Sequence, residues 1–379
     1  MPEDSSKAQQ TNGLLFIGDP HLSGRRPGRR TDLDFAGTVL KKLSHAFNIA
    51  REGGLQPIIL GDLFDRAGEQ DLRVLSRLLH LLRDHRDAGG LIPVTLAGNH
   101  DMKDATLSGD TAMAVVHESG LLRVLEDGVP VPVYRMADRQ GEQGHCIAVL
   151  VPYSYGQEYR LLENGVPSED IAKALCMKPE QPLSAVMAPN ALVIALTHAD
   201  FAFEGAYPGA KEIVEIPGVD MVVNGHMHKL CPAVRRGGTL WWNPGNITRM
   251  SMDCEGHAPR VWSWRPGEDI LTGIHLPHEK FVFNRVGVAV EPDIGSLKEE
   301  ISNPPDTWMN SRFVELLKEQ RLQDSAVTED ASGLMEEIRI VCSEKKVNEV
   351  VVDLLQDMCK SVVDGFLVED VSRYQKKGI

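Results

Sequence analysis

Cysteine is scarce in this chain, and its spacing is irregular. The 379 residues include six cysteines, and no two of them form a Cys-x-x-Cys pair. This spacing excludes the common zinc–thiolate motifs and gives no sign of a disulfide framework. We therefore expect reduced thiols, several of them buried, in a reducing compartment.

Long apolar runs are also missing. No stretch approaches the roughly 20 apolar residues that a membrane-spanning helix needs. The first residues, MPEDSSKAQQTNG, are polar and lack the basic and then apolar pattern of a signal peptide. The sequence therefore predicts a cytoplasmic protein that does not act on a membrane.

Excess positive charge is absent as well. The formal net charge is −14 at pH 7, which excludes a protein that coats nucleic acid through its overall field. Much of the acidity lies in residues 291–379. The densest basic cluster lies instead in the loop after His21, and we predict that it binds a phosphate backbone: Arg25, Arg26, Arg29 and Arg30. A solvated or partner-binding loop is the alternative interpretation.

The first third of the chain alternates between two kinds of apolar pattern. Short buried runs predict strands, and runs with apolar residues every three or four positions predict helices. This order indicates parallel strands joined by right-handed crossovers. The predicted strands are 14–18, 57–60 and 91–97, and the predicted helices are 32–52 and 69–88. Further strands are predicted at 131–135 and 145–152 as an antiparallel pair, and at 191–198, 218–228 and 237–245.

Five loops that follow these strands carry side chains that bind hard metal ions. Ligand sites in such sheets gather at the carboxyl ends of the strands, so we expect the five loops to meet. Oxygen and imidazole ligands suit Mn²⁺, Fe²⁺, Zn²⁺ or Mg²⁺, and several histidines weigh against Mg²⁺ alone. The residues are Asp19 and His21, then Asp62 and Asp65, then Asn99, His100 and Asp101, then His198, and last His226 and His228.

The order of these motifs, DPH, GDLFD, GNHD, a single His and then GHMH, resembles the calcineurin-like metallophosphoesterase superfamily over residues 14–228. The resemblance implies an α/β fold, a four-layer α-β-β-α sandwich of two mixed sheets. It also implies two metal ions, with Asp62 bridging them. One ion would be held by Asp19, His21, Asp62 and His228, and the other by Asp62, Asn99, His198 and His226.

Two divalent ions, Mn²⁺ first among them, suit phosphoester hydrolysis because they lower the pKa of a bridging water and stabilise charge on the phosphoryl oxygens. In the superfamily, the histidine that matches His100 contacts the phosphate or protonates the leaving oxygen, which is general acid work. Asp101 would orient His100. The resemblance therefore implies that His100 and Asp101 are catalytic residues beside the metal ligands.

Two further stretches, LTHADFAFEGA (196–206) and the segment from GHMH to PGNITRMS (225–251), are similar to the SbcD-type nuclease subunit of DNA double-strand-break repair. Asn246 stands where that family usually has serine. The similarity implies a DNA exonuclease or endonuclease that works in recombination and repair with an SMC-like (SbcC-type) ATPase. The alternatives are a phosphodiesterase or phosphatase for a small molecule or phosphoprotein, and a scaffold without catalysis.

The same resemblance suggests how the chain is divided. We predict a disordered segment at 1–13, a catalytic core at 14–257, a small β-rich cap at 258–295 and a helical C-terminal region at 296–379. The apolar stripe of residues 346–367 would bind the ATPase or pack on its own domain. A short cap suggests a phage or mobile-element branch of the family. A homodimer formed through helices near the first two motifs is a further possibility.

Overall fold

The computed structural model describes residues 10–68, 71–103, 107–135, 145–178, 181, 186–206 and 209–284. The chain divides into two compact units, Met1–Val286 and Gly287–Ile379. The second unit lies outside the described residues. The helix predicted at 346–367, with its partner-binding role, therefore lies outside them as well.

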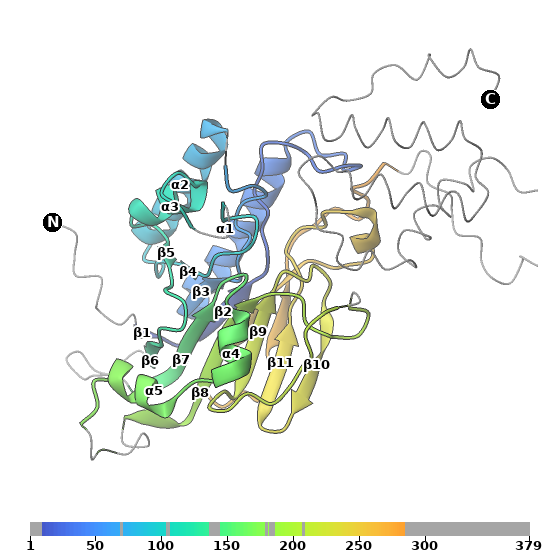
Figure 1. Cartoon of the computed structure of the whole chain (residues 1–379). Coiled ribbons are helices and arrows are strands. Elements are labelled where there is room, and N and C mark those ends of the chain that lie inside the picture. The colour runs from blue at the N-terminus through green and yellow to red at the C-terminus, as the bar shows by residue number, and fades with distance from the viewer. Residues whose placement is uncertain are drawn as a thin grey trace, which may run out of the picture. The chain divides into compact units, whose positions relative to one another are not determined.

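Two mixed sheets form the centre of the first unit (Figure 1). The seven-stranded sheet has the order β1-β6-β7-β8-β9-β11-β10, and the six-stranded sheet has the order β13-β12-β2-β3-β4-β5. The strands of the first sheet are β1 (Gln10–Thr11), β6 (Val131–Arg135), β7 (Cys146–Tyr153), β8 (Met187–His198), β9 (Met221–Gly225), β10 (Cys231–Arg236) and β11 (Thr239–Asn243). Those of the second are β2 (Gly13–Ile17), β3 (Leu55–Ile59), β4 (Val94–Thr95), β5 (Arg123–Val124), β12 (Arg260–Trp264) and β13 (Thr272–His275).

Helices cover the outer face of each sheet. Leu15 and Ile17 pack against the helical side of the six-stranded sheet, whereas Leu14 and Phe16 point into the core between the sheets. This alternation is the strand period of two, with both faces buried. The six-stranded sheet packs with α1 (Phe35–Gly53), α2 (Leu72–Asp87) and α3 (Ala112–Glu118), and the seven-stranded sheet with α4 (Glu158–Asn164) and α5 (Ser168–Ala174). The four-layer sandwich that the sequence predicts is confirmed.

The adjacent residues Trp241 and Trp242 of β11 pack into two different hydrophobic cores, one on each face of the sheet. Trp241 packs with the outer helices of the seven-stranded sheet, and its Nε1 donates to the carbonyl of Val214 at 2.8 Å. Trp242 points to the other face, into the core between the sheets. Successive residues of a strand face opposite sides, so one strand contributes a large side chain to each layer.

Residues 258–295 do not form a separate cap where they are described. β12 pairs antiparallel with β2, and β13 pairs with β12, so both belong to the six-stranded sheet. Trp262 and Trp264 enter the core between the sheets, while Val261 packs on the helical side. A strand that buries both faces has to lie in a sheet, and β2 offers it a free edge. The boundary predicted at residue 257 therefore does not separate a β unit from the core.

The prediction of a disordered segment at residues 1–13 is wrong for its last residues, which are ordered from Gln10 onward. Gln10 and Thr11 pair in parallel with β6, and β2 begins at Gly13. The hydroxyl of Thr11 donates to the carbonyls of Gly13 and Gly54, at 2.6 and 2.8 Å. These local bonds order a polar stretch that has too few apolar residues to be recognised as a strand. Residues 1–9 lie outside the described residues.

The sequence predicts no membrane-spanning helix and reduced cysteines, and both can be compared with the described part of the chain. None of the helices in this part is long and apolar enough to cross a membrane. Its cysteines are free thiols: Cys146, Cys231 and Cys254 are buried and Cys176 is exposed. The remaining two, Cys342 and Cys359, belong to the second unit.

Candidate metal centre

The candidate ligands meet because each follows the carboxyl end of a parallel strand. β2, β3 and β4 lead into the loops of Asp19, Asp62 and Asn99. β8 ends at His198, and β9 leads into His226. Parallel strands end at the same edge of a sheet, and here the matching edges of both sheets converge. Long-range folding therefore assembles a site from five short motifs.

The backbone at this edge is held in an unusual conformation. Five described residues other than glycine have positive φ, and four of them are candidate ligands: Asp19 (28°), His21 (48°), Asp62 (46°) and His226 (74°). Such residues cost of order 1–3 kcal/mol each and persist where the surroundings over-determine them. Their clustering at one edge marks this edge as functional.

Glycines beside the ligands allow the loops to approach one another closely. A side chain at Gly98 would collide with the carboxylate of Asp62. A side chain at Gly225 would collide with the carbonyl of Leu60 and crowd the ring of His198. The glycine in the GNHD motif and the glycine in the GHMH motif are therefore required by the packing of the site.

The first candidate group contains His21, Asp62 and His228, whose ligand atoms lie within 4.8 Å of one another. Nε2 of His21 lies 2.8 Å from Nε2 of His228 and 3.5 Å from Oδ2 of Asp62. The resemblance adds Asp19 to this group. Its carboxylate is buried, and Oδ1 lies 3.7 Å from Nδ1 of His198, which the resemblance assigns to the other ion.

The second candidate group contains Asp62, His198 and His226. Nδ1 of His198 donates to the carbonyl of Leu60 at 2.7 Å, so Nε2, which lies 3.2 Å from Oδ2 of Asp62, is the nitrogen that can bind a cation once the ring is deprotonated. Nδ1 of His226 lies 3.0 Å from Oδ1 of Asn99. Asp62 is the one residue common to both groups, as expected of a bridging carboxylate.

Unpaired atoms in the site fit divalent cations. In the described structure, both carboxylate oxygens of Asp19 and Nδ1 of His21 are buried without a hydrogen-bond partner. Buried polar groups are almost always paired, so several such atoms at one point indicate a missing partner of opposite charge. Oxygen and imidazole donors suit Mn²⁺, Fe²⁺, Zn²⁺ or Mg²⁺. The residues at this edge therefore fit the divalent metals that the sequence predicts.

Burial and neighbouring charges shift the pKa values of the ligands in opposite directions. Burial raises the pKa of Asp19 to about 7. Burial alone would lower the pKa of His198, but the adjacent carboxylates of Asp62 and Asp19 raise it to about 9. Burial lowers the pKa of His228 to about 4. The metal-free site therefore holds protons on Asp19 and His198 near neutrality, while His228 is ready to coordinate.

We expect the affinity for Mn²⁺ to rise with pH, more steeply below about pH 7 than between about pH 7 and 9. A cation binds the deprotonated ligands, so it must displace the protons of Asp19 and His198 below their respective pKa values. Each displaced proton changes the affinity by about tenfold per pH unit. Isothermal titration calorimetry at several pH values, in buffers with different ionisation enthalpies, measures both the affinity and the protons released. A pH-independent affinity would contradict this assignment.

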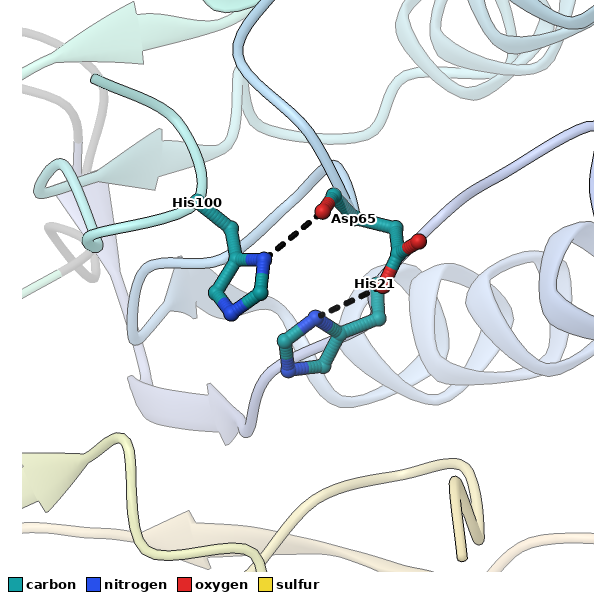
Figure 2. Close-up of side chains that lie close together, drawn as sticks. All are labelled: His21, Asp65 and His100. Carbon is teal, nitrogen blue, oxygen red and sulfur yellow. Dashed lines mark hydrogen bonds and ion pairs between the residues drawn. The ribbon is translucent and has the colours of Figure 1, made fainter. Parts of the chain in front are cut away.

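His100 lies next to the first group and is held by the loop of Asp65. Nδ1 of His100 donates to the main-chain carbonyl of Asp65 at 2.7 Å, and Oδ1 of Asp65 lies 3.8 Å from Nδ1 of His21 (Figure 2). The main-chain N–H of His100 donates to Oδ1 of Asp62 at 2.9 Å. Because Nδ1 is occupied, Nε2 is the atom that can exchange a proton with a substrate.

Asp101 has a different role from the one that the sequence predicts. It is fully buried, and its carboxylate accepts from the main-chain N–H groups of Leu63, Phe64 and Gly98 at 3.0–3.3 Å. His100 is oriented by Asp65 instead. Burial raises the pKa of Asp101 to about 8. Asp101 therefore ties the GDLFD loop to the GNHD loop and does not orient His100.

The arginine loop divides into exposed and buried members. Arg25, Arg26 and Arg29 are exposed, whereas Arg30 is 3% exposed. Nε and Nη2 of Arg30 donate to the two carboxylate oxygens of Asp32, at 2.7 and 2.9 Å, and Nη1 donates to the carbonyl of Arg249 at 2.6 Å.

The guanidinium of Arg30 also lies over the rings of Phe35 and Phe283, with 5.2 and 5.7 Å to their centroids. With its ion pair to Asp32 and these two rings, Arg30 has no surface left for a ligand. The prediction that Arg30 binds phosphate is therefore wrong, because this residue anchors the loop.

We expect Arg30→Ala to lower the free energy of unfolding by about 3–5 kcal/mol, because it leaves the nearly buried carboxylate of Asp32 without its charged partner. Arg29→Ala removes an exposed arginine of the same loop and serves as the matched control, with an expected change within about 0.5 kcal/mol. Denaturant unfolding followed by tryptophan fluorescence measures both. Equal stability of the two variants would show that Arg30 is not an anchor.

Sequence reasoning missed two residues of the site. Oδ2 of Asp200 lies 3.2 Å from Nε2 of His226, and carboxylates in this position commonly orient metal-binding histidines. Tyr155 lies beside His226 and His198, with 5.5 and 6.4 Å between ring centroids. Asp200 could have been found from its place two residues after His198. Tyr155 has no sequence signal, since its loop follows β7, which carries no candidate ligand.

A family model matches most of the described unit. The model of the calcineurin-like phosphoesterase family matches residues 14–230, more than half of the chain. This range contains every candidate ligand from Asp19 to His228. A search of the curated proteins finds no match.

Two solved bacterial proteins match part of this chain. One is a protein of Staphylococcus aureus, provisionally designated a 5′-nucleotidase and solved with α-ketoglutarate, with 12% sequence identity and a TM-score of 0.34 over 72% of this chain. The other is a hypothetical protein of Thermus thermophilus, with 15% identity and a TM-score of 0.33 over 70% of this chain and 99% of that one. The chain spans 56% of the length of the S. aureus protein.

Proposed function

Since the chain belongs to the calcineurin-like phosphoesterase family, we propose that its metal-dependent phosphoesterase site hydrolyses phosphodiesters in DNA. The observation that carries the choice of substrate is the set of exposed arginines, Arg25, Arg26 and Arg29, on the loop that leaves His21. Arginine contacts with phosphates supply much of the affinity of proteins for nucleic acids. The similarity of two segments to the SbcD-type nuclease supports the same substrate.

The residues of the site can divide the work of phosphodiester hydrolysis. Asp62, His21 and His228 would hold one ion, and Asp62, His198 and His226 the other, with Asp19 and Asn99 completing the sets. When bound, such ions lower the pKa of water and neutralise charge on the phosphate.

The chain's own general acid would be His100. Its Nδ1 is bonded to the carbonyl of Asp65, so Nε2 can deliver a proton to the leaving oxygen.

The variant that replaces Arg25, Arg26 and Arg29 with alanine tests the substrate. We expect DNA binding to weaken by about tenfold or more for each lost contact, and the slope of log affinity against log salt to fall by roughly two to three. Hydrolysis of bis(p-nitrophenyl) phosphate should be unchanged. A matched control removes three exposed arginines of α2, Arg73, Arg83 and Arg86. An unchanged salt dependence in the loop variant would exclude the loop as a DNA-binding element.

A second candidate function is the hydrolysis of a small phosphodiester or phosphomonoester. Two carboxylates at the site, Asp65 and Asp200, are 26% and 45% exposed, and they disfavour a long polyanion at those points. The same loop variant separates the two functions. Brisk hydrolysis of the chromogenic diester by a protein that does not bind DNA at low salt would favour the second.

We further propose that the C-terminal region binds an SMC-like ATPase, as the similarity to the SbcD-type subunit suggests. Support comes from the apolar stripe of residues 346–367 in the sequence. Deleting residues 296–379 should abolish co-purification with such an ATPase while cleavage of DNA by the isolated chain persists. Unchanged co-purification would contradict the proposal.

A further inference from the structure

Tyr155 presents an exposed aromatic ring beside the second candidate metal group. The side chain is 38% exposed and does not belong to the buried clusters of the described fold. Its ring is tilted by 45° against His226, with 5.5 Å between centroids, and stands edge-on to His198 at 6.4 Å. Neither histidine therefore stacks flat on the face of the tyrosine.

The loop of Tyr155 is fixed beside the candidate metal centre by hydrogen bonds whose donors are main-chain N–H groups. The N–H of Tyr155 donates to the carbonyl of Ala97 at 3.0 Å, two residues before Asn99. The N–H of Ala97 in turn donates to the hydroxyl of Ser154 at 3.1 Å, and the N–H of Ser154 donates to Oδ1 of Asp127 at 2.6 Å. The main-chain N–H of Gln157 donates to the carbonyl of Ser154 at 2.9 Å and closes the turn.

The anchored main chain limits the positions that the ring can take. An exposed tyrosine on a mobile loop would lose conformational entropy of both loop and side chain on meeting a substrate, whereas a ring on an anchored loop loses only that of the side chain. The ring takes no part in the core clusters of the described residues, so its placement is not explained by packing in the hydrophobic core. It lies within reach of a group bonded to a phosphate at His226 and His198.

We propose that Tyr155 is a stacking platform for the nucleobase next to the reacting phosphate. The proposal rests on the proposed function, and it specifies how the substrate strand lies at the second metal group. Aromatic rings bind bases of any sequence through their π faces, and loss of such a contact weakens binding by about 5- to 150-fold. The platform therefore gives affinity for single-stranded DNA without sequence specificity.

The test compares Tyr155→Ala and Tyr155→Phe with Tyr159→Ala, which removes a tyrosine that is 49% exposed four residues further along. Binding of a single-stranded phosphorothioate oligonucleotide is measured by fluorescence anisotropy in the presence of Mn²⁺. A second oligonucleotide lacks the base next to the scissile phosphate. We expect Tyr155→Ala to weaken binding of the intact strand by about 5- to 150-fold and binding of the abasic strand by less than about twofold.

Tyr155→Phe and Tyr159→Ala should bind both strands as the wild type does. An equal loss for the intact and abasic strands in Tyr155→Ala would overturn the platform, because the ring would then act on the histidines and not on a base. If the wild type cleaves DNA and Tyr155→Ala binds it normally, only the platform fails. If the wild type neither binds nor cleaves the oligonucleotides, the proposed substrate fails and the platform fails with it.

Discussion

Asp62→Asn is expected to lower the rate of phosphoester hydrolysis by at least about 10³-fold. Asp62 belongs both to the group of His21 and His228 and to the group of His198 and His226, and its Oδ2 lies 3.5 Å from Nε2 of His21 and 3.2 Å from Nε2 of His198. The positive charge of His198 lowers the pKa of Asp62 against the effect of burial, so the carboxylate is ionised and available for cations. Metal ions contribute several kcal/mol of transition-state stabilisation, and each 1.36 kcal/mol is a factor of ten in rate.

The measurement pairs steady-state hydrolysis of bis(p-nitrophenyl) phosphate with the metal content of the protein after gel filtration. We expect the bound Mn²⁺ to fall from two ions per chain to one or none. Asp84→Asn on the exposed side of α2 is the control and should change neither quantity. Circular dichroism checks that both variants are folded. A variant that keeps both ions and full activity would remove Asp62 from the centre of the mechanism.

His100→Ala is expected to slow DNA cleavage by about 10²- to 10⁴-fold, the usual contribution of a general acid. The effect should depend on the leaving group. Nε2 of His100 is the atom available for proton transfer, and a sugar alkoxide needs that proton whereas p-nitrophenolate does not. Hydrolysis of bis(p-nitrophenyl) phosphate should therefore fall much less than DNA cleavage. Both rates are measured with saturating Mn²⁺, because the metal content should stay unchanged.

The control for this variant is His80→Ala, which removes an exposed histidine of α2 whose Nδ1 bonds to Ser76 of the same helix. An equal loss for both substrates in His100→Ala would mean that the residue binds the phosphate rather than protonating the leaving oxygen. No loss for either substrate would remove His100 from the reaction.

The sandwich and the placement of its polar loops could be predicted because they depend on local patterns. An apolar run followed by Gly-Asp or Gly-Asn predicts both a strand and the edge where it ends, as at Asp62 and Asn99. Parallel pairing then brings these ends together without further information from the sequence. The structure brings these residues together, while their roles as ligands remain predictions.

The misses share a different physical origin. Phe283, which covers Arg30, lies more than 250 positions away in the sequence. The local sequence therefore gave no reason to distinguish Arg30 from the exposed arginines of the same loop. Asp101 faces the main chain of Leu63 and Phe64, a contact that exists only once two loops are packed. β12 pairs with β2, although the two strands lie at opposite ends of the unit in sequence. Long-range contacts decided each of these cases.

Four candidate ligands have a left-handed backbone conformation, and this predicts which substitutions would accumulate at their positions if the protein were not selected for activity. Glycine adopts positive φ without strain, so replacing Asp19, His21, Asp62 or His226 by glycine would relieve the local backbone while it removes a ligand. Stabilising substitutions are easily found at strained functional positions, and they cost activity. A laboratory evolution experiment that selects this protein for heat resistance alone would therefore lose its metal centre before its fold.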